Sequence, residues 1–126
     1  MTNIFLLLIA FQIKHLIADY YLQFPYMYLN KGQKTGWFKP LFDHSFVHSI
    51  GTFMIVSLYS LYVNVFFMYF WLLPLFDFVT HFITDRWKAT RGRTPDQPKF
   101  WYDLGIDQMV HHIVSIIIVY ILVIAI

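Results

Sequence analysis

The sequence contains no cysteine, and only 13% of its 126 residues are charged. Without cysteine, neither a disulfide framework nor a thiolate metal site can form, so a metal would have to be bound by nitrogen and oxygen. The net charge of +2 is too small to indicate nucleic-acid binding, and we expect no nucleic-acid partner. Apolar residues dominate instead, since 59% of the chain is hydrophobic and 21% is aromatic.

Four apolar stretches are each long enough to cross a bilayer, which takes about 20 residues. A soluble domain of this size could not bury so much apolar surface, whereas lipid can cover it. The predicted fold class is therefore all-α and integral to the membrane, with four transmembrane helices in a single domain of residues 1–126. The first stretch carries Lys14 and lacks the basic leader of a signal peptide, so we expect it to remain as a helix. The stretches are residues 3–24, 41–63, 65–87 and 100–126.

Positive charge gathers in two of the three connections. The connections 25–40 and 88–99 contain or adjoin every lysine and arginine except Lys14. In a four-pass chain these two connections share one face, which the positive-inside rule makes cytoplasmic. We therefore expect a multi-pass protein of the bacterial inner (cytoplasmic) membrane with both termini outside. The remaining connection, near residues 62–66, holds only Asn64 as a turn former and predicts a tight hairpin.

Ionisable residues inside the apolar stretches recur four positions apart. Such residues are costly within a bilayer, so each is a candidate for function. Four-residue spacing places the members of a pair on one face of a helix. Counting about 1.5 Å per residue from the basic side puts all of them within about 5 to 18 Å of that side. The candidate metal ligands are His15, Asp19, His44, His48, Asp77, His81, Asp85, Asp107 and His111.

The same pattern occurs in both halves of the chain, residues 1–63 and 64–126. We interpret the halves as two pseudo-repeated helical hairpins that run in the same direction. A pseudo-twofold axis along the membrane normal would then turn the two sets of ligands toward each other. In this repeat His15-x-x-x-Asp19 corresponds to His81-x-x-x-Asp85, and the pair His44 and His48 corresponds to Asp107 and His111.

Imidazole and carboxylate groups at this spacing are ligands for a divalent transition metal, with zinc expected first and manganese or iron as alternatives. The candidates outnumber the ligands of one tetrahedral ion, so we predict two ions. Such a pair activates water and holds the oxygens of a phosphate ester. The hypothesis is a membrane-embedded metal-dependent hydrolase of a lipid or isoprenoid phosphate near the cytoplasmic leaflet, surrounded by membrane lipids. The sequence leaves a homo-oligomer open.

Individual roles follow from this hypothesis. Asp19, Asp85 and Asp107 are the candidate catalytic carboxylates. Gln23 and Gln108 lie beside the ligands and are expected to hydrogen-bond to them. Four residues on the basic side are expected to bind phosphate: Lys31, Arg86, Lys88 and Arg91.

Other functions fit the same residues. A metal-ion or proton transporter also uses His and Asp pairs in membrane helices, but it needs polar groups leading to both faces, and the outer half offers almost none. A membrane di-iron oxidase usually needs more than the six histidines present here. A non-catalytic phage or bacterial membrane module with a structural metal stays open as well. An isolated histidine is more often a hydrogen-bonded interior residue, and agreement across four helices is what favours a metal.

These residues resemble the pattern of a family of small bacterial and phage membrane proteins, the domain of unknown function thirty-three-oh-seven. The resemblance covers nearly the whole chain and implies a shared site without naming a reaction. Asp77 lies outside this pattern. A looser similarity to membrane-bound metal-dependent hydrolases rests on the type of ligand. The matching positions are His15-x-x-x-Asp19-x-x-x-Gln23, Lys31, His44 and His48, His81-x-x-x-Asp85-x-x-Lys88, and Asp107-Gln108-x-x-His111.

The predicted orientation can be tested with single cysteines, because the chain has none of its own. A cysteine at Lys34 or Arg91 should resist an impermeant thiol reagent applied to intact cells, whereas one at Tyr62 should react. Labelling at Lys34 and Arg91 with protection at Tyr62 would reverse the orientation.

Overall fold

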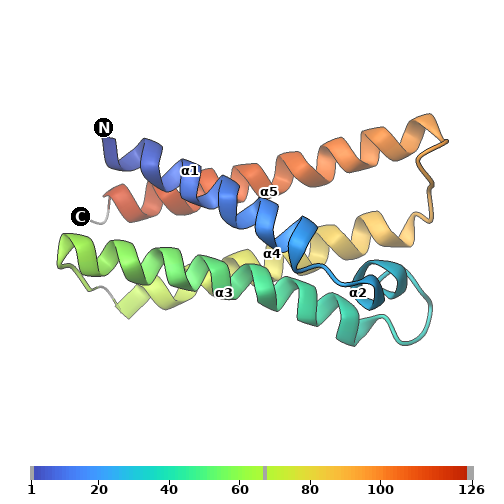
Figure 1. The fold of residues 1–126 in the computed structure, drawn as a ribbon, viewed down its shortest axis with the longest axis horizontal. Coiled ribbons are helices and arrows are strands. Elements are labelled where there is room, and N and C mark those ends of the chain that lie inside the picture. Colours follow the sequence, from blue (N-terminus) through green and yellow to red (C-terminus); the bar gives the residue numbers. More distant parts are fainter. Residues whose placement is uncertain (1, 67, 125–126) are drawn as a thin grey trace.

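The computed structural model describes residues 2–66 and 68–124, which form helices joined by short connections, with no strand among them. Four long helices form an elongated bundle, with both termini at one end and the helix α2 and the α4–α5 connection at the other (Figure 1). The all-α prediction is confirmed for these residues. In chain order the elements are α1 (Thr2–Leu16), the π-helix η1 (Ile17–Tyr21), α2 (Pro25–Asn30), α3 (Phe38–Val63), the 3-10 helix η2 (Met68–Trp71), α4 (Leu72–Thr90) and α5 (Pro98–Ile124).

Three segments of the described chain are long and apolar enough to cross a membrane: Asn3–Tyr21, Phe38–Val63 and Pro98–Ile124. The sequence predicted four such segments, and three are found among the described residues. The helix α4 has 19 residues, and its charged side chains lower its hydropathy. It begins later than the predicted stretch 65–87, because a 3-10 turn precedes it. The last two residues of the predicted stretch 100–126 lie outside the described residues.

The connection between α3 and α4 is the tight turn that the sequence predicts. Asn64 adopts the left-handed conformation with φ 54°. Its N–H donates to the Leu61 carbonyl at 3.2 Å, and the Val65 N–H donates to the Ser60 carbonyl at 3.1 Å. This pair of bonds is a Schellman motif, which ends a helix and satisfies its last carbonyl groups. The turn packs α4 antiparallel to α3, so the polar residues of both helices face the same interior.

The first long helix ends in a π-turn rather than continuing to residue 24. The Leu22 N–H donates to the Ile17 carbonyl at 2.9 Å, which is the bond pattern of a π-helix. Phe24 is extended, with φ −71° and ψ 158°, as the residue before Pro25 prefers. The chain therefore leaves the bundle at this point and turns back through α2. Asp19 lies inside the π-turn, and such turns are frequent at functional sites.

The interior is divided along its length into an apolar half and a polar half. The half near the termini contains a cluster of buried apolar side chains, including Phe11, Ile118 and Leu122. The half near α2 and the α4–α5 connection is filled by buried histidines and aspartates. Large apolar side chains instead cover much of the outer surface, for example Leu58 at 64% and Ile116 at 54% exposure. Polar groups inside and apolar groups outside are the distribution that a lipid environment favours.

A buried ion pair lies at the border between the two halves. Lys14 Nζ lies 2.6 Å from Asp77 Oδ2, and the Thr52 hydroxyl donates to the same oxygen at 2.5 Å. A Cβ atom at Gly51 would come within 2.7 Å of Lys14 Cγ. The missing side chain at Gly51 is therefore what allows the stem of Lys14 to cross from α1 toward α4.

Replacing Lys14 by methionine should destabilise the protein by about 3–5 kcal/mol, because Asp77 would keep a buried charge without its partner. The double variant Lys14→Met/Asp77→Leu should recover much of this loss. Denaturant unfolding in detergent measures both. Equal stability of Lys14→Met and the parent would show that the ion pair is not buried as described. Lys34→Met is the control, since Lys34 is exposed.

Candidate metal centre

Imidazole and carboxylate groups from all four long helices meet in the polar half of the bundle. Each predicted pair faces inward, because a spacing of four residues keeps both members on one helix face. The histidines of this cluster are at most 8% exposed, and two of the aspartates are as deeply buried. The cluster contains eight of the nine predicted ligands: His15, Asp19, His44, His48, His81, Asp85, Asp107 and His111.

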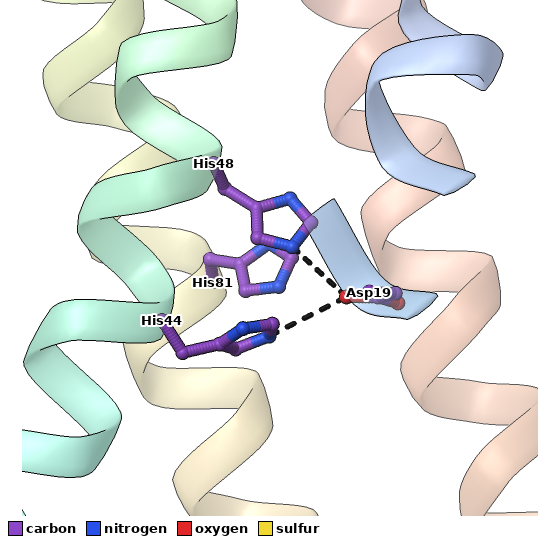
Figure 2. Close-up of side chains that lie close together, drawn as sticks. All are labelled: Asp19, His44, His48 and His81. Carbon is purple, nitrogen blue, oxygen red and sulfur yellow. Dashed lines mark hydrogen bonds and ion pairs between the residues drawn. The ribbon is translucent and has the colours of Figure 1, made fainter. Parts of the chain in front are cut away.

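One group of potential ligands consists of Asp19, His44, His48 and His81. One ligand atom from each of these residues lies within 4.8 Å of the others. Figure 2 shows the three imidazoles on α3 and α4 turned toward the Asp19 carboxylate on η1. The Nε2 atoms of His48 and His44 lie 2.9 and 3.4 Å from Asp19 Oδ1.

A second group consists of His81, Asp85 and His111. Asp85 Oδ1 lies 3.1 Å from His111 Nε2 and 3.6 Å from His81 Nε2. His81 belongs to both groups, and its ring stacks on those of His48 and His111 at centroid distances of 3.6 and 3.8 Å. His44 also links the groups, because its Nε2 is 3.3 Å from Asp85 Oδ2. The two groups therefore form one continuous centre.

The contacts follow the pseudo-repeat of the sequence. Asp19 lies 2.9 Å from His48 in the first half, and the equivalent Asp85 lies 3.1 Å from the equivalent His111 in the second. Each carboxylate also contacts the histidine four residues before it, at 3.0 Å for Asp19 and 3.6 Å for Asp85. The two hairpins thus contribute equivalent pairs to one centre.

Two lysines neutralise carboxylates of the centre. Lys31 Nζ lies 2.6 Å from Asp85 Oδ2, and Lys88 Nζ lies 2.7 Å from Asp107 Oδ2. In both aspartates the second oxygen faces a histidine, with Asp107 Oδ1 3.3 Å from His111 Nε2. Each of these carboxylates can therefore hold a lysine through one oxygen and a metal through the other.

Asp19 differs from the other two carboxylates. Its side chain is 13% exposed, and every ion-pair contact that the described residues make to it comes from an imidazole. A buried carboxylate needs a positive partner. For Asp19 that partner is either a protonated histidine or a metal ion.

The two predicted glutamines both form hydrogen bonds at the edge of the centre. Gln23 accepts a hydrogen bond from Lys31 at 2.8 Å and donates one to the Asp19 carbonyl at 3.0 Å. Gln108 Oε1 lies 2.9 Å from His15 Nε2, and its amide donates to Asp107 at 3.1 Å. Both amides therefore hold residues of the centre in place.

The four basic residues predicted to bind phosphate separate into two kinds. Lys31 and Lys88 reach the centre, as described above. Arg86 instead donates to the carbonyl groups of Lys31 and Gln33 and lies over the Trp37 ring. Arg91 stacks on Trp87 and lies 3.8 Å from Asp103. These arginines contact the connections instead, so the structure does not bring them to the carboxylates of the centre.

The structure does not bring Asp77, the ninth predicted ligand, to the centre. Asp77 lies outside both groups of potential ligands found among the described residues, and it pairs with Lys14 and Thr52. The physical reason is depth, since Asp77 lies one helical turn beyond His81, where Lys14 approaches from α1. In the sequence, Lys14 was the indication of this ion pair, because it is the only lysine or arginine away from the two basic connections.

The geometry of the centre fits a transition metal. Ligands about 2.0–2.2 Å from a tetrahedral zinc ion lie about 3.3–3.6 Å from one another. Of the seven nitrogen–oxygen separations between the described histidines and Asp19, Asp85 and Asp107, four lie between 3.3 and 3.6 Å, and the other three, at 2.9 to 3.1 Å, have the length of hydrogen bonds. In addition, His81 Nε2 is buried and has no hydrogen-bond partner among the described residues. That atom lies where the two groups meet and is available as a ligand.

Comparison with protein families gives one match, which covers residues 6–126 and is described as "Protein of unknown function (DUF3307)". The chain belongs to this family. The match includes every residue of the centre and confirms the resemblance inferred from the sequence. No curated protein and no solved structure matches the chain. Membership of DUF3307 names no reaction, so the similarity to metal-dependent hydrolases stays a prediction.

The protein purified gently in detergent should contain at least about one equivalent of zinc, manganese or iron. His81→Ala should lower the metal content most, because His81 belongs to both groups. Asp103→Asn is the matched control, since Asp103 is buried but pairs with Arg93, not with the histidines. Elemental analysis of the parent and both variants measures this. A parent protein without any transition metal, or unchanged metal content in His81→Ala, would contradict a metal centre.

Proposed function

We propose that the protein is a membrane-embedded metal-dependent hydrolase that acts on a phosphate ester of a lipid or isoprenoid alcohol at the cytoplasmic leaflet. The observation that carries this proposal is the environment of Asp19, a half-buried carboxylate surrounded by the imidazoles of His15, His44 and His48. A divalent transition metal supplies the missing positive charge, and zinc is the first candidate for these ligands.

The charges of the centre favour a metal over protonated histidines. Asp85 and Asp107 are each neutralised by a lysine, which leaves the charge of Asp19. A single protonated histidine would balance that charge, but it would leave the other four imidazoles of the centre without a cation to bind. A metal binds neutral imidazoles and so uses all of them. The two overlapping groups provide ligands for two ions, which is the number we propose.

The residues of the centre have distinct roles in this proposal. A bound divalent ion supplies an activated water and polarises the phosphoryl oxygens. Asp19 is the most exposed of the three carboxylates, at 13% against 3% for Asp85 and 1% for Asp107. It is therefore best placed to accept the proton of the attacking water. Lys31 and Lys88 neutralise Asp85 and Asp107, so the charge of two divalent ions would exceed that of Asp19 and would favour a bound phosphate.

The membrane topology forms part of the proposal. Three helices have the length and composition of membrane spans, and α4 is enclosed with them in the same bundle. We infer that α4 crosses as a fourth span, because its charged side chains Asp77, Asp85 and Lys88 are paired inside. The basic connections then lie in the cytoplasm, and the centre opens toward that side.

Transport of metal ions or protons is the main alternative, and the apolar half of the bundle argues against it. A transported ion would have to pass the Lys14–Asp77 pair and then the cluster around Phe11 and Ile118. The fixed ammonium group repels cations, and the apolar cluster offers them no ligands. A di-iron oxidase and a non-catalytic module with a structural metal are distinguished from a hydrolase by the experiment below.

Phosphate release from long-chain alkyl or isoprenoid phosphates, measured in detergent with added zinc or manganese, should depend on the centre. Asp19→Asn should lower the rate by about 10²-fold or more, because it removes the proposed base while keeping the size of the side chain. Asp96→Asn, at an exposed position in the α4–α5 connection, is the control and should keep the parent rate.

The outcome for Asp19→Asn separates catalysis from structure. A folded, metal-loaded Asp19→Asn protein that hydrolyses at the parent rate would contradict the role of Asp19. Metal binding by the parent without hydrolysis of any phosphate ester would instead favour a structural metal. Reduction of oxygen by an iron-loaded parent would favour the oxidase.

A further inference from the structure

An apolar groove runs along the outside of the bundle between α1 and α3. It has a volume of about 590 Å³ and is lined by side chains such as Ile13, Ile17, Ile50 and Met54. A second hollow of about 370 Å³ shares Ala10, Ile55 and Leu58 with it and continues to Asn3 and Tyr62. The two hollows therefore form one path along the helix pair.

The path is long enough to hold an extended hydrocarbon chain. It reaches from Leu22, which follows η1, to Asn3 near the start of α1. At about 1.5 Å per residue this is about 28 Å, close to the thickness of the hydrocarbon core of a bilayer. Both helices that form the groove are candidate membrane spans. The groove therefore faces hydrocarbon rather than water.

The only charged residue that lines the groove presents no charge to it. The ammonium group of Lys14 is turned inward to Asp77 at 2.6 Å, so the residue offers its methylene stem to the groove. Gly51, on the opposite wall, leaves room for that stem. The lining is thus predominantly hydrocarbon, with Asn3 and Tyr62 at the end away from the centre, which suits an alkyl or isoprenoid chain.

The groove passes the level of the metal centre near one of its ends. Ala18 and Leu22 line it, and Asp19 lies between these two residues in the sequence. Asp19 is also the carboxylate of the centre with the greatest exposure, at 13%. A chain lying in the groove therefore brings its polar end to the most accessible part of the centre.

We propose that this groove binds the single hydrocarbon chain of a long-chain phosphate ester, with the phosphate at Asp19 and the chain directed toward Tyr62. This inference rests on the proposed function and specifies its substrate class, an amphiphile with one long chain. The adjacent groove between α3 and α4, lined by Phe46, Leu75 and Phe78, has no residue of η1 in its lining, so it does not pass Asp19 and serves as the comparison.

Photolabelling can locate the chain without relying on catalysis. The probes are two alkyl phosphates, one with a diazirine next to the phosphate and one with a diazirine at the far end of the chain. In full-length protein reconstituted into phospholipid nanodiscs, the first probe should label near Ala18 and Leu22, and the second near Asn3 and Tyr62. An excess of unlabelled alkyl phosphate should compete, and phospholipid should not.

Variants that fill the groove provide the second arm. Ala10→Trp and Met54→Trp lie on opposite walls, away from the centre. Each should lower photolabelling and hydrolysis of the long-chain ester by about tenfold, the change expected when about two methylene groups lose their contacts. Hydrolysis of a short-chain phosphate and the metal content should stay at the parent level. Leu75→Trp, in the α3–α4 groove, should leave all four measurements unchanged.

The two arms separate failure of this inference from failure of the proposed function. Labelling spread equally over both grooves, or labelling that phospholipid removes, would show ordinary contact with bilayer lipid and overturn the inference. An effect of Leu75→Trp equal to that of Ala10→Trp would do the same. Ordered labelling along the α1–α3 groove without any hydrolysis would support the binding site and count against the proposed reaction.

Discussion

Carboxylates buried between apolar helices need positive partners. The course of the chain in this bundle brings each of these partners to its carboxylate. Lys88 reaches Asp107 from the last turn of α4. Lys31 can reach Asp85 only if the chain leaves α1 early and turns back, which the π-turn and Pro25 accomplish. Asp19 receives imidazoles alone, and this unequal supply of positive charge is what points to a metal.

The connection that carries Lys31 is held in place by residues whose role was not evident from their type. A Cβ atom at Gly32 would lie 2.6 Å from the Ala89 carbonyl oxygen, so the connection packs directly on the end of α4. Arg86 donates to the carbonyl of Lys31 at 2.8 Å and fixes the backbone beside it. An arginine expected to hold a phosphate thus stabilises the segment that neutralises Asp85. The centre depends on these contacts because Lys31 is only 6% exposed and must be placed accurately.

The sequence predicted the main features of the fold and the centre because these depend on local periodicity. Four-residue spacing within each helix identified the inward pairs, and Asn64 identified the hairpin. What it could not show were contacts between helices far apart in the chain. Lys14 and Asp77 pair across α1 and α4, so Asp77 was assigned to the metal on spacing alone. The π-turn was not predicted either, because the sequence there reads as ordinary helix.

The two halves of the pseudo-repeat make equivalent contacts, but some of their equivalent positions carry different residue types. His44 of the first half corresponds to Asp107 of the second, so one side of the centre has an extra imidazole and the other an extra carboxylate paired with Lys88. His81 belongs to both groups of ligands, whereas its equivalent, His15, contacts Asp19 and Gln108 at the edge. Two ions bound here would therefore occupy unequal sites, which suits a displacement in which one ion activates water and the other holds the leaving oxygen.

X-ray absorption spectroscopy of the zinc-loaded protein tests the central claim most directly, because it reports the ligands of the metal itself. Zinc bound in the buried cluster should have nitrogen and oxygen ligands at about 2.0–2.2 Å, with the multiple-scattering pattern of several imidazoles. The same spectrum of His81→Ala should show fewer imidazoles. A zinc spectrum with oxygen ligands only, unchanged by His81→Ala, would contradict the account, since it would place the metal outside the buried cluster.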